Sequence, residues 1–227
     1  MNASKSFSSL KIANLIPIPK TKTNLNLSSN YRPISLLSNF SKILESLVAS
    51  RLNSFLVKYN ILYDYQFGFR RHHSTKLALL HTTDDIYKRF DDKLCVAGIF
   101  LDFSKAFDSL DHAILLNKIY NYGFRGQIWN WIRSYLSDRK QISTVNNVKS
   151  SSCSLRFGVP QGSVLGPLLF LLYINDIGNI PNLQYKPKVL QTTPIFLYIA
   201  ILQIICKFNH RMRSIKLLIG WRLTDYQ

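Results

Sequence analysis

Cysteine is scarce in this sequence, and its three thiols are widely spaced: Cys95, Cys153 and Cys206. They form no Cys-x-x-Cys pair and have no histidine at ligand spacing, so the sequence indicates neither a disulfide framework nor a zinc site. The first ten residues are rich in serine and lack the apolar core of a secretory signal. We therefore expect a reducing, intracellular compartment, cytoplasm or nucleus, and no secretion.

Long apolar runs are also missing. The longest, residues 194–206, is interrupted by Gln203. It falls short of the ~20 residues that a helix needs to cross a bilayer. The sequence therefore predicts no membrane partner.

Acidic residues are few: 12 Asp and Glu stand against 29 Lys and Arg, which gives a net charge of +17. Such an excess of cations is the electrostatic signature of a protein that binds nucleic acid. A ribosomal-type or merely soluble basic protein is the alternative that charge alone leaves open. The hydrophobic content of 47% exceeds that of disordered chains and predicts a folded core.

Hydrophobic periodicity predicts a mixture of helices and strands, hence an α+β fold. Helices are expected over 42–58, 74–90, 114–120, 128–136 and 165–177, and strands over 12–19, 94–103, 142–148 and 154–157. The segment at 12–19 contains two prolines and is predicted as an edge strand or an extended arm, and residues 30–33 are predicted as a turn.

Two of the helices carry clear predictions of cap and buried face. Ser41 or Asn39 is expected to cap the first helix, and Ser74 the second. The predicted inward residues are Ile43, Leu44, Leu47, Val48 and Leu52 in the first helix and Leu77, Leu80 and Ile86 in the second.

One acid ends an otherwise apolar strand, at Asp102, with Asp108 and Asp111 close behind. A carboxylate in such a place is costly unless it is neutralised, most naturally by a metal ion. The alternative is that Asp102 caps a helix beginning near Ser104, and the residues alone leave both interpretations open.

A glycine- and proline-rich loop spans residues 158–167 and leads directly into an apolar helix. It is typical either of a phosphate-binding turn or of a tight strand-to-helix connection, and Gln161 is its only long polar side chain. A basic turn at residues 70–73 stands before another helix. Its arginines suit the grip of a triphosphate, although a solvated basic turn is equally consistent.

Together these segments resemble the reverse transcriptases of non-LTR retrotransposons, jockey-like elements especially. The resemblance covers residues 11–177 and rests on five segments in order: Asn30–Leu37, Gln66–Arg70, Leu101–His112, Gly158–Pro167 and Tyr173–Ile177. It implies the fingers and part of the palm of a right-hand polymerase, which transfers nucleotides with two Mg²⁺ ions. The implied partners are an RNA template, a DNA primer and deoxynucleoside triphosphates.

The resemblance also assigns roles to single residues. Asp102 corresponds to the metal-binding, catalytic acid of the first acidic motif, and the carbonyl of Phe103 to a further metal contact. The ring of Phe107 corresponds to the group that excludes a 2′-hydroxyl. Arg70 corresponds to the triphosphate-binding arginine of the fingers, while Asp108 and Asp111 are given no metal. The loop that packs on the incoming nucleotide and the template corresponds to Gln161 and Gly162.

The family's second acidic motif, an aromatic residue followed by Ala-Asp-Asp, is missing. It is expected shortly after Asp176, where the only later acid is Asp225. We therefore expect no polymerisation by this chain, and the alternative function is a non-enzymatic, basic nucleic-acid-binding remnant. The expected organisation is an arm (1–29), fingers and palm (30–182) and a non-native tail (183–227), without a thumb and with an open apolar edge on the central sheet.

A frame disruption accounts for the missing motif. Codons for residues 189–196 can be chosen so that a one-base shift spells Phe-Ala-Asp-Asp-Thr-Asn-Ile. The same shift applied to residues 213–227 yields a segment that resembles the family's sequence after its catalytic turn. We therefore predict that one base is lost or gained between about Asp176 and Val189.

Overall fold

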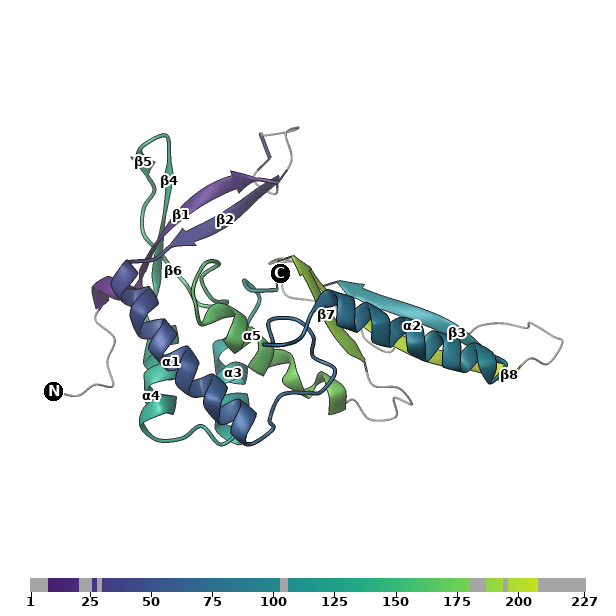
Figure 1. Cartoon of the computed structure of the whole chain (residues 1–227). Coiled ribbons are helices and arrows are strands. Elements are labelled where there is room, and N and C mark those ends of the chain that lie inside the picture. The colour runs from purple at the N-terminus through teal and green to yellow at the C-terminus, as the bar shows by residue number, and fades with distance from the viewer. Residues whose placement is uncertain are drawn as a thin grey trace.

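The computed structural model describes residues 8–20, 26–27, 30–102, 106–179, 187–193 and 196–207. It contains two sheets and five α-helices in this part of the chain, and so confirms the predicted α+β class (Figure 1). The elements are η1 (Ser8–Lys11), β1 (Ile12–Pro19), β2 (Tyr31–Leu36), α1 (Asn39–Lys58), α2 (Thr75–Asp91), β3 (Leu94–Asp102), α3 (His112–Asn121), α4 (Gln127–Leu136), β4 (Lys140–Val145), β5 (Val148–Lys149), β6 (Cys153–Ser154), α5 (Gly166–Ile174), η3 (Asn175–Asn179), β7 (Lys188–Thr193) and β8 (Phe196–Lys207).

The first sheet has the order β2-β1-β4-β5, with β6 also paired to β4. The predicted strand β1 is present, but its predicted place at an edge is wrong, because β1 lies between β2 and β4. Its pairing with β4 ends at Leu15, opposite Ser143, so Pro17 and Pro19 face β2 alone. The prolines therefore interrupt no ladder on the β4 side. Residues 30–33 were predicted as a turn leading to a helix, but residues 31–36 form the strand β2 instead.

Helices α1, α3, α4 and α5 surround the main hydrophobic core, with the first sheet at one end (Figure 1). The sequence of α5 is apolar nearly all round, and its residues Leu168, Leu169, Phe170, Leu171 and Leu172 are all buried. A helix without a polar face has to be enclosed by other elements. The core thus fixes α5 and the loop that precedes it.

The predicted buried face of α1 is confirmed only in its second half, where Leu52 is buried and Val48 packs against the core. Ile43, Leu44 and Leu47 are 57%, 41% and 60% exposed. Besides Leu52, the helix buries Ser41, Glu45, Ala49 and Leu56. The inward face of its first half is polar because it packs on a loop whose backbone N–H groups need an acceptor. Ser38, one residue before the predicted Asn39, provides the cap through its hydroxyl, which accepts from the Ser41 N–H at 3.1 Å.

The second sheet has the order β3-β8-β7, and α2 packs on it (Figure 1). Ser74 caps α2 as predicted, but Leu77 and Leu80 are exposed, and Ala78 and Thr82 face inward. Small residues allow close approach of the helix, where the buried Lys188 of β7 donates to the carbonyl of His81 and to the Asp85 carboxylate.

The predicted open edge of the central sheet is wrong on one side of β3. Strand β8 pairs antiparallel with β3 along its length, from Leu94 opposite Lys207 to Asp102 opposite Tyr198. The physical reason is the apolar, β-prone composition of β8, which suits a strand of a sheet.

Candidate functional site

The glycine-rich loop at 158–162 is docked on the turn that follows β3. The Gly158 N–H donates to the Leu110 carbonyl at 2.7 Å, and the Val159 N–H donates to the Phe107 carbonyl at 2.8 Å. Gly158 has a φ of +78°, and a Cβ there would lie 2.5 Å from the Phe107 oxygen. Only glycine allows so close an approach of two backbones.

The same loop is held on its other side by β2. The Ser35 N–H donates to the Gln161 carbonyl at 2.7 Å. Gly162 has a φ of +114°, and a Cβ there would lie 2.8 Å from the Ser35 carbonyl oxygen. The backbone of Gln161 is therefore fixed between β2 and the turn after β3.

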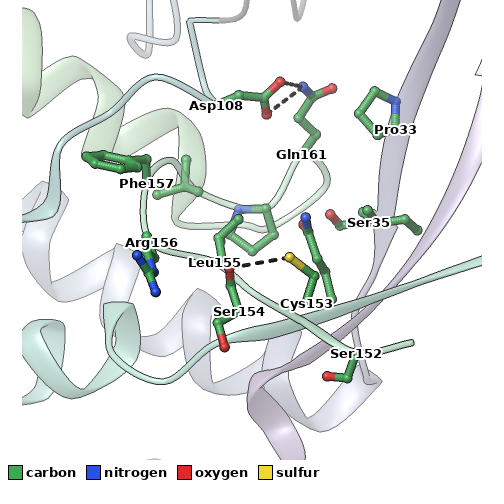
Figure 2. Close-up of a pocket in the computed structure, with 14 residues that line it drawn as sticks. Pro33, Ser35, Asp108, Ser152, Cys153, Ser154, Leu155, Arg156, Phe157 and Gln161 are labelled. Carbon is green, nitrogen blue, oxygen red and sulfur yellow. Dashed lines mark hydrogen bonds between the residues drawn. The ribbon is translucent and has the colours of Figure 1, made fainter. Parts of the chain in front are cut away.

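The Gln161 side chain meets Asp108 beside a cavity of about 850 Å³ (Figure 2). Its amide nitrogen lies 3.1 and 3.2 Å from the two carboxylate oxygens of Asp108. The cavity is lined by this pair together with residues of β1, β2 and β4 and the stretch from Ser152 to Pro160. Its walls thus join the first sheet to the loop that the sequence singled out.

Downstream, the loop is held by Glu45 of α1, a residue that the sequence analysis did not select. Its carboxylate, 1% exposed, accepts from the N–H groups of Val164 at 2.7 Å and Leu165 at 3.2 Å. The Ser41 hydroxyl donates to the same carboxylate at 3.2 Å. The sequence contained one signal for this role: Glu45 lies four residues after Ser41 and four before Ala49, on the face of the helix that is buried.

Phe107 lies beneath the loop rather than in the cavity wall. It is 7% exposed, and its ring packs 5.3 Å from the Phe170 ring and 5.9 Å, edge to face, from the Phe69 ring. Its predicted role in excluding a 2′-hydroxyl stays a prediction. What its contacts establish is a bridge between α5 and the segment that holds Arg70.

Arg70 is half-buried, and its guanidinium donates to the Tyr63 carbonyl at 3.0 Å. Among the predicted site residues, Gln161 lines the described cavity, whereas Arg70, Phe107 and Gly162 do not. The contact of Phe69 with Phe107 links the segment that holds Arg70 to the turn on which the loop is docked.

Asp102 is the last residue of β3, as predicted, while Phe103 lies outside the described residues. The helix that follows begins at His112, and Asp111 caps it by accepting from the Ala113 and Ile114 N–H groups at 2.8 and 2.9 Å. The described residues 106–111 form no helix, and residues 103–105, which Asp102 would cap, lie outside the described residues, so the alternative that Asp102 caps a helix near Ser104 stays a prediction. His112 in turn lies 2.7 Å from the Gly158 carbonyl, through its Nε2 atom, and so also supports the loop.

The register of the second sheet sets the surroundings of Asp102. Tyr198 of β8 pairs with Asp102 of β3 on one side and with Leu190 of β7 on the other, and the last described pair of β7 and β8 is Thr193 with Phe196. The end of β7 at Thr193 and the start of β8 at Phe196 thus lie at the Asp102 end of the sheet. Its β7 arm carries the neutral residues Gln191, Thr192 and Thr193.

These residues do not fit a two-metal site, which needs carboxylates from two strands. Asp102 is the single acid at this end of the sheet. Within the part of the chain that the structure describes, no three His, Cys, Asp or Glu side chains gather as metal ligands. The described helices also include none that is long and apolar enough to span a membrane.

The sequence model of the family described as reverse transcriptase (RNA-dependent DNA polymerase) matches residues 18–214. The chain belongs to this family. It is 41% identical over 167 residues to the probable RNA-directed DNA polymerase from transposon BS of Drosophila melanogaster, covering 74% of this chain and 18% of that protein. It is 37% identical over 168 residues to the RNA-directed DNA polymerase from mobile element jockey of the same species, with the same two coverages. The resemblance to jockey-like, non-LTR reverse transcriptases is confirmed, and the chain spans about a fifth of the length of these relatives.

Among solved structures, the chain is similar to an apo telomerase from Candida tropicalis truncated from its C-terminal domain. The TM-score is 0.56 at 14% identity, over 85% of this chain and 44% of the telomerase. A second telomerase structure from this species, in complex with a fragment of telomeric RNA, gives a TM-score of 0.57 at 12% identity, over 87% of this chain and 37% of that one. At such identities the likeness concerns the fold alone, and it agrees with a partial right-hand polymerase.

Proposed function

We propose that this reverse transcriptase domain binds nucleotide and nucleic acid but does not extend a primer. One observation carries the proposal: β3 ends in Asp102, and the β7 arm of the neighbouring hairpin has Gln191, Thr192 and Thr193 where the family resemblance calls for Ala-Asp-Asp. Nucleotidyl transfer in this family depends on charge neutralisation by two metal ions. A single carboxylate does not assemble that centre, so no step of the reaction is derived through it.

Support for the binding half comes from charge and from the docked loop. The net charge of +17 favours a polyanionic partner, with an RNA template and a DNA primer as the proposed ones. The cavity beside Gln161 is the proposed place of the incoming deoxynucleotide, since its loop is rigidly tied to β2 and to the turn after β3. Magnesium is the proposed ion of the family's complete site.

Primer extension separates binding from catalysis. A labelled DNA primer on an RNA template is incubated with Mg²⁺, the four deoxynucleoside triphosphates and either the chain or its Asp102→Ala variant. We expect no incorporation by either protein. Incorporation by the unmodified chain that disappears in Asp102→Ala would overturn the proposal.

Fluorescence anisotropy with the same duplex measures the binding half. We expect an affinity that falls steeply with salt, because cations on the protein displace counterions from phosphates. Asp102→Ala should bind as well as the unmodified chain. A chain that leaves the duplex free at low salt contradicts the binding half, whatever the extension assay gives.

A further inference from the structure

The pairing of Asp108 with Gln161 decides which way the glutamine amide faces. Both carboxylate oxygens of Asp108 lie near the Gln161 nitrogen, at 3.1 and 3.2 Å. An ionised carboxylate only accepts hydrogen bonds, so it has to meet the NH₂ end of the amide. The amide oxygen then faces away from Asp108, as Figure 2 shows.

The backbone leaves this side chain little other freedom. The Gln161 carbonyl is held by the Ser35 N–H at 2.7 Å, and Val159, two residues before it, by the Phe107 carbonyl at 2.8 Å. Gly158 packs against the backbone of Asp108 itself, so that a Cβ there would lie 2.7 Å from the Asp108 Cα. The backbone positions of Asp108 and Gln161 are therefore fixed, and the Asp108 carboxylate determines the orientation of the Gln161 amide.

We propose that Asp108 is a positioning residue that makes Gln161 present a hydrogen-bond acceptor to the nucleotide. The site then favours a ligand group that donates, such as a sugar hydroxyl or a base N–H, over one that accepts. The inference rests on the proposed function, because it takes the cavity beside Gln161 as the place of the nucleotide. It gives a role to Asp108, which neither charge nor sequence pattern had assigned.

Three variants isolate the orientation. In Asp108→Asn the new side chain has both an acceptor oxygen and a donor NH₂ group, so the Gln161 amide can bond to it in either orientation. The swapped pair Asp108→Asn with Gln161→Glu restores the arrangement, because the new amide at position 108 donates to one oxygen of the new carboxylate and the other oxygen faces outward, with the same net charge. Asp111→Asn is the matched control: it removes an equal charge three residues further along, where asparagine is as good a helix cap as aspartate.

The first readout is independent of any ligand. In the ¹⁵N-labelled chain, the side-chain NH₂ signals of Gln161 are identified by their loss in Gln161→Leu. We expect these signals to move in Asp108→Asn toward those of solvent-exposed glutamines and to stay in place in Asp111→Asn. Unmoved signals in Asp108→Asn would show that the carboxylate does not hold the amide, and the proposal would fail.

The second readout is calorimetric binding of three probes: thymidine triphosphate, its 3′-deoxy analogue and its N3-methyl analogue. Each analogue lacks one donor. In the unmodified chain we expect one of them to bind about three- to tenfold more weakly, the effect of one neutral hydrogen bond. This penalty should vanish in Asp108→Asn, return in the swapped pair and persist in Asp111→Asn.

The two readouts fail separately. If the unmodified chain binds none of the probes, the proposed nucleotide site is wrong, and with it the selection of donors, while the NMR signals still decide whether Asp108 orients Gln161. If the probes bind but the analogue penalty is absent, or is unchanged in Asp108→Asn, the nucleotide site stands and the inference is wrong. Thermal melting of each variant verifies that it is folded.

Discussion

The Glu45 carboxylate, in the middle of α1, accepts hydrogen bonds from the backbone N–H groups of Val164 and Leu165, which lie 119 and 120 positions further along the chain. One buried acid therefore joins the first long helix to the loop that ends in α5. The arrangement satisfies N–H groups that precede the helix and lack any other acceptor in it. It ties the fingers side of the molecule to the loop that carries Gln161.

Replacing Glu45 with leucine should destabilise the fold. The Val164 and Leu165 N–H groups would lose their acceptor, at about 1–3 kcal/mol for each group that becomes buried and unpaired. Glu45→Gln should lose clearly less, because its amide oxygen still accepts. Urea unfolding measures the difference, with Ser46→Ala on the exposed face of the same helix as control. Equal losses in the leucine and glutamine variants would contradict this account.

The Tyr135 hydroxyl should make stability fall at high pH. Tyr135 is 2% exposed, and burial raises the pKa of its phenol, with a further rise from the charge of Glu45. The unfolded chain releases this proton above about pH 10, the ordinary tyrosine pKa, before the folded chain does. Its contribution is therefore complete below that pH and is lost as the pH rises toward the raised folded pKa.

Tyr135→Phe should reduce the fall in stability above about pH 10, because phenylalanine has no phenol proton to release. Denaturant midpoints taken on both sides of about pH 10 give the comparison. Burial lowers the pKa of Lys11, which changes stability in the opposite sense, so only the difference between the chain and the variant reports on Tyr135. An identical pH profile for the two proteins would count against the assignment.

Gly158→Ala should undock the loop from the turn after β3. The new Cβ would lie 2.5 to 2.8 Å from backbone atoms of Phe107 and Asp108, which cannot rotate away as a flexible side chain can. Gly126→Ala is the matched control: its φ is also positive, at +64°, but nothing lies within 4 Å of its Cβ. The control should lose only ~1–2 kcal/mol of stability, which is the cost of an alanine in the left-handed conformation, and Gly158→Ala should lose more stability than that. Thermal unfolding distinguishes the two, and comparable losses would mean that the loop contact is unimportant.

The sequence predicted where elements lie better than which way they face. Helix α1 was expected over nearly its true length, because caps and periodicity are local signals. The buried face of its first half was predicted wrongly, because Glu45 turns inward only to meet Val164, a contact distant in sequence. Strand β1 shows the same limit: its prolines predicted an edge, but the pairing with β4 ends before Pro17 and leaves them harmless.

The candidate site divides along the same line. The loop around Gln161 was found from its own glycines, since each answers a local need for positive φ or close approach. Its partner Asp108 was left without a role, because the hydrogen bond depends on the docking of two segments. The hydrogen bond from the Ser35 N–H to the Gln161 carbonyl could not be predicted either, because every residue except proline has a backbone N–H.

The final prediction concerns the gene. The one-base shift places the two aspartates of the missing motif at the positions of Thr192 and Thr193, and the sheet register brings these positions to the hairpin beside the end of β3. Two acids there would stand close to Asp102, as a two-metal centre requires. We expect the nucleotide sequence that encodes residues 189–196, read from the last base of the Val189 codon, to spell Phe-Ala-Asp-Asp. The codons for residues 158–176 are the control, since they should match the family without a shift. Any other reading of residues 189–196 would exclude a frame disruption and leave the absent acids as a loss within the coding sequence itself.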